Sequence, residues 1–118
     1  MDAQSSYKRL DIFTFSKKLV LSCYALTQDL PVEEKSNLIF YIRNAALAAH
    51  LSISQGMFLQ KGKAKKKFLQ QAKNAYVVID AAVDVLIELK LVTEEQTTEV
   101  FELTSACYQQ TESLLKEN

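Results

Sequence analysis

The chain has 118 residues, with 14 basic and 14 acidic side chains and therefore no formal net charge. Two glycines, one proline and no tryptophan argue against an all-β fold, which needs more turn residues, and the neutral total argues against a uniformly basic nucleic-acid-binding protein. No apolar run approaches the roughly 20 residues of a membrane span and the first residues lack the apolar core of a signal peptide, so we expect no membrane contact and a cytoplasmic location.

Apolar residues recur at three- and four-residue steps in four segments, which predicts helices at about 7–29, 32–56, 63–91 and 94–116 of a single domain, residues 1–118. Pro31 separates the first two segments, because proline fits the first turn of a new helix. The second segment carries many small residues, which would let a neighbouring helix approach closely. Gly56 is expected to end it, because glycine adopts the left-handed conformation found at many helix ends.

The third segment alternates steps of four and three, the spacing of a helix-bundle seam: Phe68, Ala72, Ala75, Ile79, Ala82, Leu86 and Leu89. Thr93 and Gln96 have the spacing of a capping box, which predicts the start of the fourth helix. The predicted core residues of that helix are Val100, Thr104, Cys107, Thr111 and Leu114. Four long helices with short connections predict an all-α, antiparallel up-down-up-down four-helix bundle.

About two-thirds of the circumference of the third helix is apolar or alanine when its residues are placed at about 100° each. A helix in a bundle needs only one apolar stripe for the core. The surplus predicts a subunit interface; a broad core with scattered exposed apolar residues is the alternative. The expected interface residues are Phe13, Val20, Tyr24, Tyr76, Val83, Phe101 and Tyr108.

Charge is segregated along the chain. Residues 35–79 include eight basic residues and no acidic one, whereas residues 80–118 include nine acidic residues and only two basic ones. An antiparallel bundle would place the lysine-rich second connection at one end and the acidic first and third connections at the other. Phosphate contact requires only positive charge, so the expected nucleic-acid-binding residues are Lys61, Lys63, Lys65, Lys66, Lys67 and Lys73. The alternative is a solvated helix start without a ligand.

No arrangement typical of an enzyme occurs in the sequence. Cys23 and Cys107 occupy apolar positions and are expected to be buried, and His50 has no nearby metal-ligand partner. Asp80 and Asp84 share a helix face, but no Glu-x-x-His motif accompanies them, as a di-iron bundle would require. We therefore expect no catalytic residues, no metal, no cofactor and no small-molecule substrate.

Three stretches carry a family resemblance: Leu30-Pro31 with Glu34, YIRNAALAAHLSISQG at 41–56, and KGKAKKKFLQQAKNAYVVID at 61–80, with no gap in spacing. In this order they resemble the 23S ribosomal RNA intervening-sequence proteins. The resemblance implies a four-helix bundle that assembles into a homopentamer. Family members occur inside ribosomal RNA genes, and related accessory proteins of diversity-generating retroelements look like basic pentamers that bind nucleic acid and a reverse transcriptase.

The chain departs from the family pattern at three places, one of which is Lys63-Ala64-Lys65, where the family has Lys-Glu-Phe. Asn44 stands where the family has a second arginine, and Gln55 stands where it has a glutamate. Arg43 remains, and Asp80 is its expected acidic partner in a structural pair. We expect a non-enzymatic oligomeric bundle that binds RNA or a ribonucleoprotein through its lysine-rich end; the alternative is a protein–protein scaffold without affinity for nucleic acid.

Overall fold

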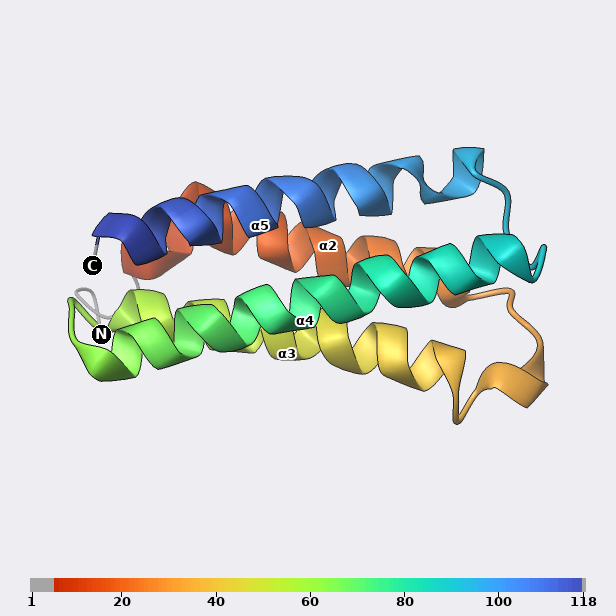
Figure 1. Ribbon diagram of the computed structural model, residues 1–118, viewed down its shortest axis with the longest axis horizontal. Coiled ribbons are helices and arrows are strands. Elements are labelled where there is room, and N and C mark those ends of the chain that lie inside the picture. The colour runs from red at the N-terminus through yellow and green to blue at the C-terminus, as the bar shows by residue number, and fades with distance from the viewer. Residues whose placement is uncertain (1–5, 118) are drawn as a thin grey trace.

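Four α-helices form an antiparallel bundle in the computed structural model, which describes residues 6–117: α2 (Asp11–Thr27), α3 (Leu38–Phe58), α4 (Lys63–Glu88) and α5 (Thr98–Glu117). Short 3-10 helices precede three of them: η1 (Ser6–Arg9), η2 (Val32–Glu34) and η3 (Glu95–Thr97). The connection between α3 and α4 lies at one end of the bundle, and the other two connections lie at the opposite end (Figure 1). The predicted up-down-up-down four-helix bundle is confirmed.

The second helix begins at Leu38, not near residue 32 as predicted. Pro31 instead starts a 3-10 turn, in which the Glu34 N–H donates to Pro31 O at 2.9 Å and the Lys35 N–H donates to Val32 O at 3.0 Å. Asn37 then leaves the helical region with φ −125° and ψ −104°. The φ angle that proline imposes suits both the first turn of an α-helix and a 3-10 turn. Pro31 therefore indicates where the chain turns but not where the α-helix begins.

The first and third helices are also shorter than predicted. Leu10 is extended and α2 begins at Asp11, whose acidic side chain suits the positive end of the helix dipole. At the end of α4, Lys90 adopts the left-handed conformation (φ 60°), and the Leu91 N–H donates to Leu86 O at 3.0 Å. These are the features of a Schellman motif, which ends the helix before residue 91.

The capping box before α5 forms as predicted. The Thr93 N–H donates to Gln96 Oε1 at 2.8 Å, and the Gln96 N–H donates to Thr93 Oγ1 at 3.2 Å. The box closes the 3-10 turn η3, and α5 continues directly from that turn. Each side chain thus satisfies a backbone N–H that the start of a helix leaves without a partner.

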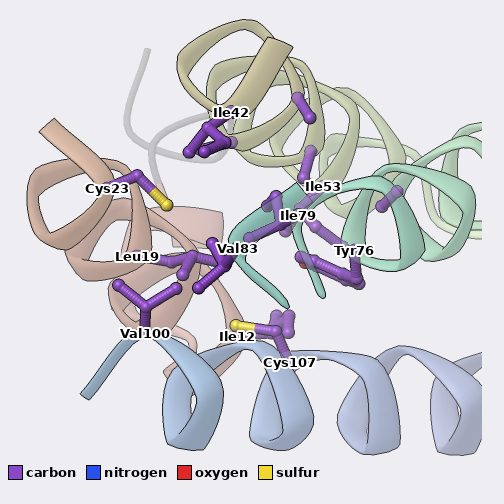
Figure 2. Close-up of a cluster of buried hydrophobic side chains, with 14 of the residues drawn as sticks. Ile12, Leu19, Cys23, Ile42, Ile53, Tyr76, Ile79, Val83, Val100 and Cys107 are labelled. Carbon is purple, nitrogen blue, oxygen red and sulfur yellow. The ribbon is translucent and has the colours of Figure 1, made fainter. Parts of the chain in front are cut away.

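One hydrophobic core runs between the four helices (Figure 2). The buried seam of α4 consists of Leu69, Ala72, Tyr76, Ile79, Val83 and Leu86. The predicted seam was therefore wrong in part, because Phe68, Ala75 and Ala82 lie at its edge and Leu89 is exposed. The buried positions of α5 match the prediction, except that Leu114 is half-buried.

Helices α3 and α4 pack most extensively against each other. Ala45, Ala46 and Ala49 are buried on α3, and such small side chains permit a close approach. A Cβ atom added to Gly56 would lie 3.3 Å from the Phe68 Cβ. Gly56 therefore allows close helix packing and does not end the helix as predicted, since α3 continues to Phe58. No helix within residues 6–117 is long and apolar enough to cross a membrane.

Candidate nucleic-acid interface

The lysine cluster is defined here as Lys61, Lys63, Lys65, Lys66 and Lys67, which surround the start of α4. Gly62 occupies the N-cap position with φ 109°, a conformation that side-chain-bearing residues rarely adopt. It turns the chain sharply from the α3 connection into α4. Four of the five lysines are exposed, and Lys65 is half-buried. The local fold thus holds the cluster on a rigid helix end.

The electrostatics of this helix end are unusual. The first turn of α4 contains no acidic residue, although the positive end of the helix dipole favours negative charge. Backbone N–H groups at a helix start can bind anions, and the lysines add positive charge at the same place. The opposite end of the bundle (Figure 1) carries the acidic residues of the first and third connections and of the first turn of α5: Asp29, Glu33, Glu34, Glu94, Glu95 and Glu99.

Two of the six predicted binding lysines make specific contacts within the protein. Lys65 Nζ donates to Gln60 O at 3.2 Å and so ties the connection to α4. Lys73 Nζ lies 3.3 Å from Glu112 Oε2 and 5.1 Å from the centre of the Tyr108 ring, and its side chain is 17% exposed. Lys73 therefore links α4 to α5 and stands apart from the lysine cluster.

The predicted pair between Arg43 and Asp80 is wrong. Arg43 Nε donates to Thr27 Oγ1 at 2.8 Å, Nη2 donates to Tyr24 O at 3.4 Å, and the guanidinium lies 4.5 Å from the Tyr24 ring centre. Asp80 is exposed and lines a groove between α4 and α5. Arg43 faces α2 and Asp80 faces α5, so the rotation of each helix about its axis separates them.

The predicted interface residues fall into two groups. Phe13, Tyr76 and Val83 are buried within one chain, at 8%, 1% and 0% exposure, and so leave little or no surface for another subunit. The other four keep exposed surface: Val20, Tyr24, Phe101 and Tyr108. For α4, the prediction assigned Tyr76 and Val83 to an outer face, whereas they lie in the core. The apolar surface of this helix is wide enough to allow either choice of core-facing residues.

Two surface grooves flank these partly exposed residues. A groove of about 280 Å³ between α4 and α5 is lined by residues that include Val77, Asp80, Phe101 and Tyr108. A groove of about 310 Å³ between α2 and α3 is lined by Tyr24, Lys35, Ile39, Phe40, Arg43, Asn44 and Leu47. The α4/α5 groove contains an acidic side chain, whereas the α2/α3 groove contains two basic ones.

A polar contact that the sequence did not reveal joins α2 and α3. Ser16 Oγ lies 2.8 Å from His50 Nδ1 and 3.1 Å from Phe13 O. Burial and the nearby Lys17 charge lower the pKa of His50. Ser16 is itself buried, so its hydroxyl cannot reach a substrate, and the contact serves packing. Positions 34 residues apart give no local signal of such a pair.

The two cysteines are buried and free, as expected. Burial raises the pKa of Cys23 to about 12 and that of Cys107 to about 11, which leaves the thiols protonated and unreactive at neutral pH. Within residues 6–117, no group of three His, Cys, Asp or Glu side chains could hold a metal ion.

Comparison with known proteins places this bundle in a sequence family. The family model described as 23S rRNA-intervening sequence protein matches residues 8–114. No curated protein matches the chain.

Proposed function

Since the chain belongs to the 23S rRNA-intervening sequence protein family, we propose that it is a non-enzymatic, self-associating bundle that binds RNA, or a ribonucleoprotein, through the lysine cluster. The observation that carries the proposal is the concentration of five lysines at a helix start without acidic residues. Lysines at this position oppose the helix dipole by a few tenths of a kcal/mol each. A polyanionic ligand would turn this small cost into a gain.

The mode of recognition follows from the residue types. Lysine ammonium groups contact phosphates as point charges, whereas base readout needs donors in fixed geometry or aromatic platforms. The lysine cluster contains neither arginine nor an aromatic side chain. The RNA is therefore recognised by its backbone and shape, and binding depends strongly on salt.

Self-association is the second part of the proposal. Large apolar side chains remain exposed on the single chain, among them Leu21, Tyr24, Phe40, Leu51 and Phe58. Exposed apolar side chains in this number support contact with further copies, and the family resemblance implies a pentameric ring. Aligned copies would gather their lysine clusters at one rim, where several weak phosphate contacts act together.

Titration of a structured RNA at two salt concentrations tests the first part. We expect binding that weakens steeply with salt, and a triple variant Lys63→Gln, Lys66→Gln, Lys67→Gln should lower the slope of log K against log salt by about 2 to 3. Lys35→Gln, toward the opposite end of the bundle, is the matched control. Absence of binding by the wild type at low salt would remove the RNA proposal.

A protein–protein scaffold is the second candidate. It is favoured by the zero net charge of the chain, because proteins that bind RNA through their overall field are usually basic. Light scattering with the RNA titration separates the two: a defined oligomer without RNA affinity supports the scaffold. A 13.4 kDa monomer at micromolar concentration would contradict self-association in either form.

A further inference from the structure

A third groove lies at the lysine-rich end of the bundle, where η1, the end of α3 and the start of α4 meet. This is the end at which α2 begins and α3 and α4 are joined (Figure 1). The groove has a volume of about 360 Å³, within the range of pockets that hold a small molecule. Its lining contains no charged side chain and is half aromatic: Tyr7, Ser54, Gln55, Phe58, Leu59 and Phe68.

The aromatic side chains of this groove are held in place by their neighbours. The Tyr7 and Phe58 rings meet edge to face, with centroids 6.3 Å apart and planes at 82°. Tyr7 makes a second edge contact with the buried Phe13, at 5.4 Å. Phe68 packs closely against Gly56, where an added Cβ would lie 3.3 Å from the Phe68 Cβ. Phe58 is nevertheless 51% exposed, so part of its ring is open to a ligand.

The lysine cluster borders this groove directly. The chain leaves the groove at Leu59, passes through Lys61 and the start of α4, and returns to the groove at Phe68. Lys65 precedes Phe68 by about one turn on the same side of α4, and its Nζ donates to Gln60 O at 3.2 Å. Positive charge for phosphates and an aromatic surface therefore lie side by side, which is the combination that proteins use to bind single-stranded nucleic acid.

We propose that this groove receives one unpaired base of the bound RNA, while the lysine cluster holds phosphates of the same strand. The inference rests on the RNA binding proposed above and names the class of RNA, which is single-stranded or has an unpaired nucleotide where it meets the protein. The base stacks on the exposed part of the Phe58 ring. Stacking accepts every base because each has a π-face, so recognition by backbone and shape is retained.

Two polar side chains of the groove suit the edge of a base. Ser54 Oγ donates to His50 O at 2.8 Å, which uses its hydrogen and leaves its lone pairs to accept from the amino or imino group of a base. Gln55 is exposed, and a glutamine amide can both donate and accept. These groups orient a bound base and satisfy its polar edge without requiring one particular base.

Comparison of three RNA ligands on the wild-type protein separates base binding from phosphate binding. The ligands are a short single strand, the same strand in a blunt duplex, and the same strand with abasic nucleotides. Phosphate contact alone favours the duplex, because its charge density is higher. The groove predicts the opposite order at equal salt: the complete single strand binds most tightly, and removal of its bases weakens binding by about tenfold.

The outcomes of this comparison distinguish the two proposals. A duplex or an abasic strand that binds as tightly as the complete single strand would overturn the base site and leave the phosphate contacts of the lysine cluster intact. Absence of binding by all three ligands at low salt would contradict the RNA proposal itself, and the base site with it.

Variants of Phe58 test the groove from the side of the protein. Phe58→Ala should weaken single-strand binding by about tenfold and leave the slope of log K against log salt unchanged, because no phosphate contact is lost. Phe58→Tyr keeps an aromatic ring and should recover most of the affinity. Phe40→Ala is the matched control, because Phe40 is 52% exposed in the first turn of the same helix, far from the lysine cluster. Equal affinities of the two alanine variants would overturn the base site.

Discussion

Helices α3 and α5 stand diagonally across the bundle and present opposite outer surfaces. The exposed residues of α3 include no charged side chain, whereas those of α5 include no apolar one: Thr98, Glu99, Glu102, Ser105, Gln109, Ser113, Lys116 and Glu117. Both helices contribute to the same core. Packing in that core therefore explains the inner faces of the two helices but not the difference between their outer faces.

The two helices are also attached to α2 by different means. α3 is attached through the half-buried Arg43, which binds Thr27 and Tyr24, and through His50 beside Ser16. α5 is attached through Glu99, which accepts from Ser22 Oγ at 2.7 Å and lies 3.8 Å from Lys18 in a largely exposed ion pair. The Ser22–Glu99 hydrogen bond is partly buried, as is the bond from Arg43 to Thr27. Partly buried polar contacts are stronger than exposed ion pairs, so we expect Arg43 to hold α3 more firmly than the Lys18–Glu99 pair holds α5.

The largest effect should come from a charge placed in the core between the two helices. Val83 is 0% exposed, and an unpaired buried carboxylate costs about 3–5 kcal/mol or more. Val83→Glu should therefore unfold the bundle and not merely disperse an assembly. Ser105→Glu, on the outer face of α5, should keep the helical circular dichroism and the urea midpoint of the wild type. A folded Val83→Glu protein with a wild-type midpoint would contradict the core described here.

Removing the contacts that attach α3 should cost more than removing those that attach α5. Arg43→Ala loses charge-assisted hydrogen bonds and should lower the free energy of unfolding by about 2 kcal/mol. Lys18→Ala breaks an exposed pair worth about 0–1 kcal/mol. Urea denaturation of both variants measures the difference, and Arg43→Lys separates the charge from the hydrogen-bond geometry. Equal losses in Arg43→Ala and Lys18→Ala would contradict the stronger attachment of α3.

Removal of the Tyr76 hydroxyl, on the α5 side of the core, should make the folded protein more stable. Tyr76 is 1% exposed, and its hydroxyl approaches Cys107 and Thr111 without hydrogen-bond geometry. A buried polar group without a partner costs about 1–3 kcal/mol. Tyr76→Phe should therefore raise the free energy of unfolding by about 1 kcal/mol, whereas Tyr108→Phe, at a half-exposed position, should not. A destabilised Tyr76→Phe protein would mean that the hydroxyl is bonded in solution.

The smallest effect concerns pH and the contact between α2 and α3. Because burial lowers the pKa of His50 in the folded chain, the unfolded chain binds its proton first as the pH falls below about 6.5. The stability due to neutral His50 is thus present above that pH and is lost as the pH falls toward the lowered pKa of the folded state. The melting temperature of the wild type should fall more between pH 7.5 and 5.5 than that of His50→Gln. Parallel curves would contradict this linkage.

The helix number, the topology and most core positions could be predicted because each depends on short-range spacing. The direction in which each helix face points, toward the core or toward a particular neighbouring helix, could not be predicted in this way. On α4, the register through Ala75 and Ala82 and the observed register through Tyr76 and Val83 both alternate steps of three and four. The observed register buries the larger Tyr76 and Val83 side chains in the core and leaves the two alanines at its edge, which removes more apolar surface from water. The same ambiguity led to the incorrect pairing of Arg43 with Asp80.

The separation of charge between the two ends of the bundle has a kinetic consequence. A neutral molecule with a surplus of lysines at one end and a surplus of carboxylates at the other has an electric dipole moment along its long axis, 43 Å in extent. In the field of a polyanion such a molecule rotates before contact, so that its positive end arrives first and more encounters are productive. Its association rate should therefore fall as salt rises, although its net charge is zero.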